Sequence, residues 1–480
     1  MTTVPLDADV IVIGAGISGL KAASDLHEKG VSTLVLEAHT QIGGRIYTER
    51  NTSTGNHYDL GASWFHSTME NPVYDQFISK WYDPSKVKYD DYNIGFVMNN
   101  ETGTFPAGCS INAIVDEMKY YAAHLEKDQT LHQTVIDYLK MKKDLITTDE
   151  VKYSTAVFKL AELMNGGTWD MITSKLAYGP GTGRDSFNTI GYDKVVDKIV
   201  ENYPIDEKVI LNTVVKSVEK IETGKADEAT VKVTTKDGKV YQSKFIILTS
   251  SLGVLKLSVE DPSEEGAITF NPPLPRSITE NFSKTHFTTL GKVIVEFEKA
   301  FWPDNDKFLV LSIPDDVDLD FASGKACSVK PFDDYSNFAP AKAFDFPCLV
   351  ANFNVVRGIP SLMFLLPSQP MKQVEAASNP QEYGYELIKP IIAKLSGLKE
   401  SELPKPKLVL TTNWGSDPYV RGAITTCAPG DVLVNDALIE GFGNIRFAGE
   451  GTAYQGHACA HGAYLSGERE ASVIIKKLGL

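Results

Sequence analysis

Apolar residues at the start of the chain change from short runs to helical spacing and back. Residues 9–14 (DVIVIG) form an apolar run that ends in glycines, and residues 14–30 then place apolar side chains at helical spacing. Residues 31–38 (VSTLVLEA) return to a short apolar run. This order predicts a strand, a helix and a second strand, which together open a parallel sheet.

The rest of the chain divides into a helical middle and several β-rich stretches. Residues 105–200 carry spaced apolar positions typical of helices, whereas residues 205–256 predict strands. Within the second stretch, Asp237-Gly238 predicts a hairpin turn and Phe245–Leu248 a buried strand. We also expect strands at 289–298 and 348–366, a helix over GYELIKPIIAKLSG that Pro390 starts or breaks, and a C-terminal strand, glycine-rich loop and helix.

Length and pattern together predict two domains. A chain of 480 residues exceeds what a single hydrophobic core commonly serves. We expect an α/β fold, with a Rossmann-like nucleotide-binding domain and a second domain of helices and antiparallel sheet. Residues 303–347, rich in Asp, Pro and Ser, predict a long excursion over the surface.

The composition limits the kinds of molecule that the protein is expected to bind. The formal net charge of −15 argues against nucleic acid and slightly favours cationic small molecules. No window approaches 18 uninterrupted apolar residues and no basic signal-peptide segment opens the chain, so we expect no membrane span and a cytoplasmic location. The five cysteines are scattered without metal-type pairing, which indicates free thiols and no metal site. The sequence does not indicate an oligomeric state.

A glycine motif lies between the first predicted strand and helix. In the pattern G-x-G-x-x-G, the first glycine makes a tight turn, the second lets a pyrophosphate approach the helix N-terminus, and the third allows close packing. Glu37 follows at the end of the second strand, where a carboxylate can accept hydrogen bonds from a ribose. The motif consists of Gly14, Ala15, Gly16, Ile17, Ser18 and Gly19.

Three further motifs carry a family resemblance. They are residues 42–45 (IGGR), 58–66 (YDLGASWFH) and 447–450 (FAGE). With the glycine motif they resemble the flavin amine oxidase family over essentially the whole chain, most closely the fungal polyamine oxidases and a related fungal corticosteroid-binding protein. The resemblance implies FAD as cofactor. It also implies noncovalent binding, because Ala423 stands where the monoamine oxidases carry their flavin-linked cysteine.

The resemblance implies which residues hold the FAD. Arg45 would meet the pyrophosphate, Gly61–Trp64 would line the isoalloxazine, and Glu450 would face the ribityl or phosphate region. The helix after Cys459 would aim its positive dipole end at the reduced flavin. The full expected set is Gly14, Gly16, Ile17, Ser18, Gly19, Glu37, Ala38, Gly44, Arg45, Gly61, Ala62, Ser63, Trp64, Val215, Trp414, Glu450, Cys459 and Ala460.

Two residues are expected to be catalytic. Lys292 heads the apolar strand pattern TLGKVIVEFE, where burial of an ammonium is costly. In the family that the chain resembles, a strand lysine at the matching position contacts the flavin N5 through a water. A cation there would also favour electron transfer to O2. His66 matches a histidine that lies near the substrate nitrogens in the fungal polyamine oxidases.

The expected substrate pocket departs from the family pattern. Ile424 stands where tyrosine is expected, Met164 where tryptophan is expected, and Gly181 and Asp185 where histidine and asparagine are expected. Fewer aromatic rings forfeit about 0.5–2 kcal/mol of cation–π attraction per contact but leave room for an apolar ligand. The expected substrate contacts are Trp64, His66, Met164, Asp185, Ile424 and His461. Further candidates are His457 and the pair Asp90 and Asp91, which would attract a distal charge or form a solvated loop.

Three hypotheses follow. The first is FAD-dependent oxidation of a secondary amine in a polyamine, spermine or an N-acetylated form, by O2 to an amine, an aldehyde and H2O2. The second is a flavoprotein that binds a steroid-like apolar ligand with little oxidase activity, and the third is an oxidase for another amine. We expect an FAD-binding domain of residues 1–80, 200–282 and 408–480, and a substrate-binding domain of residues 81–199 and 283–407.

Overall fold

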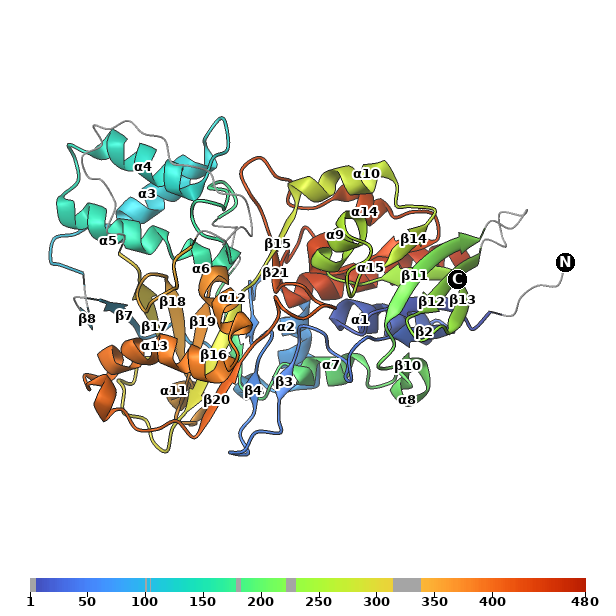
Figure 1. The fold of residues 1–480 in the computed structure, drawn as a ribbon, viewed down its shortest axis with the longest axis horizontal. Helices are drawn as coiled ribbons and strands as arrows, with labels where there is room; N and C mark the ends of the chain where they lie inside the picture. The colour runs from blue at the N-terminus through green and yellow to red at the C-terminus, as the bar shows by residue number, and fades with distance from the viewer. Residues whose placement is uncertain (1–5, 100–101, 104, 178–182, 222–229, 314–337) are drawn as a thin grey trace.

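The computed structural model describes residues 6–99, 102–103, 105–177, 183–221, 230–313 and 338–480. The described strands form two large sheets, one in each half of an elongated molecule (Figure 1). Short two- and three-stranded sheets lie between the halves. The predicted α/β class with a Rossmann-like first domain is confirmed.

The first sheet joins strands that are far apart in the sequence. Its order is β10-β2-β1-β13-β12-β11-β14, with β22 beside β13. Because β1 pairs in parallel with both β2 and β13, the carboxyl ends of these strands meet at one edge. The strands are β1 (Ala8–Ile13), β2 (Thr33–Leu36), β10 (Val209–Ile210), β11 (Val215–Ile221), β12 (Thr230–Thr235), β13 (Val240–Leu248), β14 (Thr269–Asn271) and β22 (Ile445–Phe447).

Successive residues of β1 enter two different cores, one on each face of the first sheet. Val10 and Val12 pack with helices α1, α7 and α15, whereas Ile11 and Ile13 pack with α9. A strand buried on both faces explains the uninterrupted apolar run. The helices of this half are α1 (Ile17–Glu28), α2 (Pro72–Gln76), α7 (Asp193–Ile199), α8 (Ile205–Lys208), α9 (Leu252–Glu260), α10 (Arg276–Thr279), α14 (Asp436–Glu440) and α15 (Ala460–Leu478).

The predicted hairpin at Asp237-Gly238 is confirmed. It joins β12 to β13 in antiparallel register, with Thr234 opposite Val240. The buried strand expected at 245–248 is the second part of β13 and not a separate element, because β13 pairs with β1 from Ser243 to Leu248.

The second sheet is mainly antiparallel and carries most of the other half. Its order is β20-β16-β19-β18-β17-β7-β8, and β16 is an inner strand between β19 and β20. Helices α12 and α13 pack against β16, and α3, α4 and α5 form a separate group at the far end (Figure 1). The strands are β7 (Ile94–Met98), β8 (Thr102–Gly103), β16 (Gly291–Glu296), β17 (Lys307–Leu311), β18 (Cys348–Asn352), β19 (Ser361–Leu366) and β20 (Leu408–Thr411).

The expected helical middle forms five helices among the described residues, of which α7 packs in the first half. The other helices of the second half are α3 (Ile111–Ala123), α4 (Leu131–Lys142), α5 (Thr148–Phe158), α6 (Ala161–Asn165), α11 (Phe353–Arg357), α12 (Ser368–Ala376) and α13 (Pro380–Ser396). None of the helices that the structure describes is long and apolar enough to cross a membrane.

Two sequence predictions differ from the structure. Pro390 neither starts nor breaks a helix, because α13 continues through it from Pro380 to Ser396. The stretch 303–347 is not wholly a surface excursion, since β17 lies inside it and pairs with β7 and β18 in the second sheet. Residues 314–337 of that stretch are outside the described residues.

Two elements lie on the other side of the expected domain boundaries. β20 begins at Leu408, but it pairs with β16 of the second sheet. α7 ends at Ile199, but Val195, Val196 and Ile199 belong to the core that contains α1. We therefore propose that β20 belongs to the substrate-binding domain and α7 to the nucleotide-binding domain.

Candidate active site

Short strands between the two large sheets bring the motif residues together. β3 (Thr48–Glu49) pairs with β4 (Tyr58–Asp59), and β15 (His286–Thr288) pairs with β21 (Ile424–Thr426). A third small sheet contains β5 (Trp64–Phe65), β9 (Ser186–Asn188) and β6 (Val87–Lys88). Segments from almost the whole chain therefore meet at this junction.

The first turn of α1 is open to an anionic group. Gly14 adopts φ +103°, and Gly16 is the N-cap of α1 without any side-chain cap. A Cβ built on Gly16 would find no atom within 4 Å, and the first helical turn contains no acidic residue. Free backbone N–H groups beside open space fit a pyrophosphate, as the glycine motif predicts.

Glu37 fixes the turn beside this site. Its buried carboxylate accepts hydrogen bonds from the Ala15 backbone N–H at 2.6 Å and from the His39 backbone N–H at 2.8 Å. The His39 ring lies between two carboxylates, 3.0 Å from Glu37 and 2.8 Å from Asp417. Hydrogen bonds, first to Asp417 and then to Glu37, raise the pKa of His39 to about 10, so the ring is a cation at neutral pH. This cation was not predicted from the sequence.

Arg45 connects the GGR turn to the C-terminal motif. Its Nη1 donates to the Ala423 carbonyl at 2.8 Å and to Glu450 Oε1 at 3.0 Å. The other oxygen of Glu450 accepts from Thr425 Oγ1 at 2.5 Å, and the Arg45 guanidinium lies 5.2 Å from the centre of the Phe287 ring. Arg45 thus connects Glu450 to Ala423, the residue before β21, while its remaining donors leave it able to meet a phosphate.

Lys292 lies under the loop that was expected to line the flavin. Its Nζ donates to the carbonyls of Asp59 at 2.8 Å and Gly61 at 2.5 Å and to Ser63 Oγ at 2.6 Å. An ammonium has three N–H donors, so these contacts occupy all of them. Burial lowers the pKa of Lys292 to about 8, against the opposing effect of the Asp59 carboxylate. The side chain is 5% exposed and does not reach solvent freely.

Trp64 is oriented by a buried carboxylate. Its Nε1 donates to Asp90 Oδ2 at 2.9 Å, and Lys307 Nζ lies 3.2 Å from Asp90 Oδ1. Asp91 is bonded to Arg184. Both carboxylates therefore already have a cationic partner, and Asp90, 1% exposed, is not part of a solvated loop.

His66 and Asp185 form a partly exposed hydrogen-bonded pair. His66 Nδ1 lies 2.8 Å from Asp185 Oδ2, and the Ser67 N–H donates to Asp185 Oδ1 at 3.1 Å. Burial alone would raise the pKa of Asp185, but the hydrogen bond and charge of His66 bring it below its usual value. The sequence placed these residues separately in one pocket, and only the structure shows that they are bonded to each other.

Asn71 was not predicted from the sequence. Fully buried, it caps α2 and donates to the His66 carbonyl at 2.8 Å, with His461 Nδ1 3.4 Å from the same amide. Burial, followed by the charge of His66, lowers the pKa of His461 to about 4, so His461 is neutral at pH 7. The Asn71-Pro72 dipeptide is a recognisable helix-start signal, but it does not reveal the contact with His461.

The last helix begins at the expected position. Cys459 is the N-cap of α15, and Ala458 before it adopts φ +60°. Burial raises the pKa of the Cys459 thiol to about 12, so it stays a neutral thiol. His457 Nε2 lies 2.9 Å from Thr425 Oγ1, which also bonds Glu450. These contacts attach the loop before α15 to β21.

The other predicted residues take varied positions. Trp414 donates to the Leu60 carbonyl at 3.2 Å, and Val215 begins β11 beside Thr213, whose N–H donates to the Glu37 carbonyl. Ile424 lies opposite Thr288 in β21, and α6, which contains the exposed Met164, packs against this strand. Gly181 lies outside the described residues.

The fold and the junction define a class of protein: a two-domain flavoprotein with a nucleotide site on a Rossmann-like sheet and a buried lysine from a second sheet. The family model of the flavin containing amine oxidoreductases matches residues 153–475, and that of the NAD(P)-binding Rossmann-like domain matches residues 12–81. The chain belongs to the flavin containing amine oxidoreductase family, and its cofactor is FAD.

The names of the relatives describe different ligands and substrates. The corticosteroid-binding protein of Candida albicans is 30% identical over 98% of this chain and 96% of its own length. The human peroxisomal N(1)-acetyl-spermine/spermidine oxidase is 28% identical over 97% and 94%. The chain spans about half of lysine-specific histone demethylase 1 homologue 3 of rice, at 26% identity over 97% of this chain and 54% of that one. Cyclohexylamine oxidase from Brevibacterium oxydans shares the fold, with a TM-score of 0.70 at 19% identity over 99% and 100%.

Proposed function

We propose that this protein oxidises a secondary amine of a polyamine, spermine or an N-acetylated form, using O2 and releasing an amine, an aldehyde and H2O2. Family membership supports amine oxidation, and the name of the human relative supports a polyamine substrate. The observation that carries the proposal is the Asp185 carboxylate, which stays ionised, remains partly exposed and lies beside the loop that bears Trp64 and His66.

The residues of the junction would have separate roles in cofactor binding, substrate binding and proton transfer. FAD supplies a hydride acceptor when bound, and it returns electrons to O2. The open turn at Gly16 would hold the pyrophosphate of FAD. The complex would be noncovalent, because Ala423 offers no thiol to which the flavin could be linked. Lys292 holds the Asp59–Ser63 loop and supplies a positive charge beneath it. Asp185 would bind an ammonium of the substrate, and His66 would exchange a proton with the amine that reacts.

Asp185→Asn should raise the KM for spermine by about tenfold or more, with a smaller effect on kcat. An ion pair with a substrate ammonium contributes mainly to binding, and replacing it with a neutral amide loses the charge-assisted part of the hydrogen bond. Steady-state oxygen consumption with spermine and with a monoamine checks this, because the monoamine lacks the distal charges. Asp83→Asn, an exposed carboxylate away from the pair, is the control. Equal KM values for wild type and Asp185→Asn would contradict the role.

Anaerobic mixing with candidate amines tests the proposed function. Spermine or N1-acetylspermine should bleach the flavin absorbance rapidly, and simple monoamines should bleach it slowly. Bleaching by monoamines alone would favour an oxidase for another amine. Failure of every amine to bleach the flavin would contradict the proposed activity.

A second candidate is binding of a steroid-like apolar ligand with little oxidase activity. It is supported by the Candida relative, named for corticosteroid binding, and by Ile424, an aliphatic side chain where an aromatic one was expected. Equilibrium binding of a radiolabelled corticosteroid to the FAD-loaded protein separates the candidates. Tight binding without amine-dependent bleaching would favour the second, whereas bleaching without steroid binding would favour the first.

A further inference from the structure

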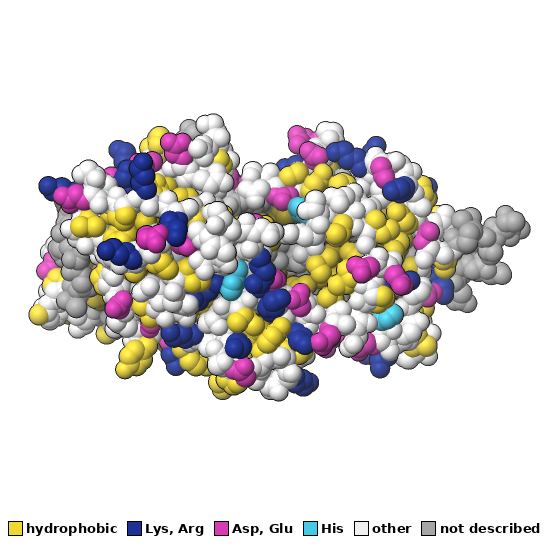
Figure 2. Space-filling model, turned by 90° about the horizontal axis from the view of Figure 1, so that it is seen from below, with side chains coloured by type: hydrophobic (Ala, Val, Ile, Leu, Met, Phe, Trp, Pro, Cys, Tyr) yellow, Lys and Arg dark blue, Asp and Glu magenta, His cyan; other side chains and the backbone are white. Residues whose placement is uncertain are grey.

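A cavity lies beside the junction and is lined by residues other than the predicted site residues. Its volume is about 860 Å³, and it opens between the β3–β4 hairpin loop and the end of α11. Figure 2 shows basic side chains gathered near the middle of the face seen from below. The described lining residues are Gly55, Asn56, His57, Ser85, Val87, Lys88, Thr189, Val355, Val356, Arg357, Gly358 and Ile359, and none of them is acidic.

Arg357 is the unusual member of this lining. Its guanidinium forms no hydrogen bond or ion pair with the residues that the structure describes, and its Nη2 is completely buried without a partner. The group packs instead against two stacked rings, with its central carbon 5.6 Å from the centre of Tyr58 and 5.4 Å from that of Phe353. Burying a guanidinium with unused donors costs free energy unless a ligand accepts its hydrogen bonds.

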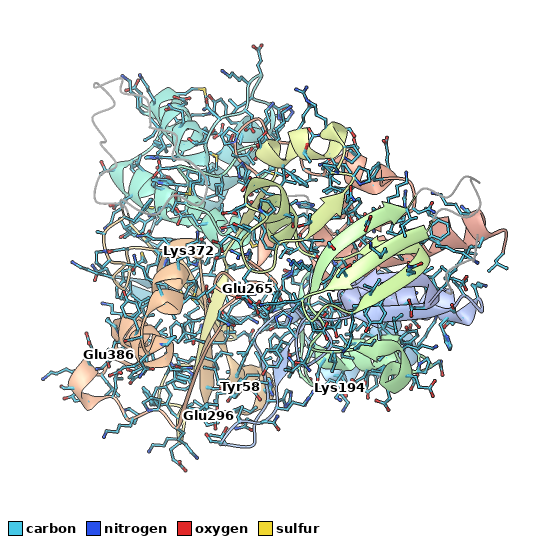
Figure 3. All side chains as sticks on the ribbon, turned by 45° about the vertical axis from the view of Figure 1, so that its right-hand side comes forward. Tyr58, Lys194, Glu265, Glu296, Lys372 and Glu386 are labelled. Atoms are coloured by element: carbon cyan, nitrogen blue, oxygen red, sulfur yellow. The ribbon has the colours of Figure 1, made fainter. Side chains whose placement is uncertain are left out.

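The nearest carboxylates do not satisfy Arg357. The Asp59 carboxylate accepts from Thr48 Oγ1 at 2.5 Å, and Glu296 accepts from Tyr58 OH at 2.6 Å. Glu296 also accepts from Thr54 and Asn56. Figure 3 shows Tyr58 and Glu296 side by side. The negative charges of these acids lower the free energy needed to bury the guanidinium. Its unpaired N–H groups remain available to a ligand in the cavity.

Other groups around the cavity match an acceptor-rich ligand. Burial, and then the positive charges of Arg357 and Arg50, lower the pKa of His57 to about 4, so this ring is neutral at pH 7 and the positive charge beside the cavity comes from the arginines. Lys88 donates to the Val355 carbonyl at 2.8 Å at the rim, and Ser85 and Thr189 add hydroxyl groups.

We propose that this cavity binds a small molecule through an oxyanion, a phosphate or carboxylate group held by Arg357 and Lys88. A planar guanidinium binds either group through two parallel hydrogen bonds, and the volume accommodates a ligand of metabolite size. Arg357 also packs against Tyr58, and the carbonyl of the next residue, Asp59, accepts from Lys292.

Calorimetric titration of the FAD-saturated protein tests the site. Sodium pyrophosphate tests for a phosphate ligand and sodium citrate for a carboxylate ligand, each against sodium chloride of equal ionic strength. At least one should bind saturably, with one site per chain. Arg357→Met preserves the packing against Tyr58 and Phe353 but removes the donors, so it should weaken this binding at least tenfold. Arg357→Lys should weaken it less.

Lys194→Met is the matched control, because Lys194 is a basic residue that does not line the cavity (Figure 3). Its binding should equal that of the wild type. If Arg357→Met fails to fold, Lys88→Met at the exposed rim should still weaken binding several-fold. Saturable binding by neither probe, or equal binding by the wild type and the folded Arg357 or Lys88 variant, would overturn the proposal.

Discussion

Replacing Lys292 with methionine should lower turnover of the best amine substrate by about 100-fold or more. Preorganised charges at a buried reacting centre commonly contribute 10²–10³ in rate. Methionine fills a similar volume but removes the cation and the three hydrogen bonds to the Asp59–Ser63 loop. Stopped-flow absorbance separates the effect on anaerobic flavin bleaching from the effect on its return with O2.

The pH dependence distinguishes the charge of Lys292 from its role as an anchor. With a pKa of about 8, the side chain is an ammonium below pH 8 and a neutral amine above it. A step that needs the cation should therefore slow as the pH rises through about 8 in the wild type, and this change should vanish in Lys292→Met. Ser63→Ala removes one acceptor while keeping the cation, so it should cost much less. Near-normal turnover of Lys292→Met would exclude the proposed role.

Replacing Gly16 with alanine should produce a stable protein that is purified almost without FAD. Gly16 has φ −71°, and a Cβ would find no atom within 4 Å, so the methyl group does not disturb the polypeptide itself. It would instead occupy the space that a pyrophosphate needs against the backbone. We expect FAD affinity to fall by about 100-fold or more, since charge-assisted bonds of 1.5–3 kcal/mol each are lost.

The control for this prediction lies three residues further on. A Cβ on Gly19 would lie 2.1 Å from the Gly14 carbonyl oxygen, so Gly19→Ala should lower both FAD content and the melting temperature of the apoprotein. Flavin absorbance per protein and thermal unfolding of the apoproteins measure the two quantities. Full FAD content in Gly16→Ala would show that the cofactor does not lie against this turn.

Local patterns were reliable where short-range packing decides the structure. The strand, helix and strand from Ala8 to Leu36 follow from apolar spacing and from glycines at the turn. The same reasoning failed at Pro390, where α13 continues because Ile388, Ile391 and Ile392 are fully buried. Their burial offsets the hydrogen bond that a proline removes. Tertiary packing can thus override a local helix-breaking signal.

The bonding partners of the predicted site residues could not be predicted from the sequence. No pattern in the sequence indicates that Asp90 bonds Trp64 or that Arg45 bonds Glu450, which lies 405 residues away. Nor did it indicate His39 or Asn71, because a single histidine or asparagine has no pattern that distinguishes it. Such residues are identified only when distant segments are brought into contact.

Lys292 illustrates both what the sequence determines and what only the tertiary structure decides. By itself, the sequence determined the Rossmann-like start, the resemblance that implies FAD, and the position of Lys292 on a strand, because periodicity, turn chemistry and motif spacing are properties of neighbouring residues. Only the tertiary structure decided that its ammonium lies on carbonyls and a hydroxyl 229 to 233 residues away, and that Arg357 packs against Tyr58 and Phe353 with Nη2 unpaired. The physical reason is that the free energy of a buried charge depends on which distant groups the chain topology places around it.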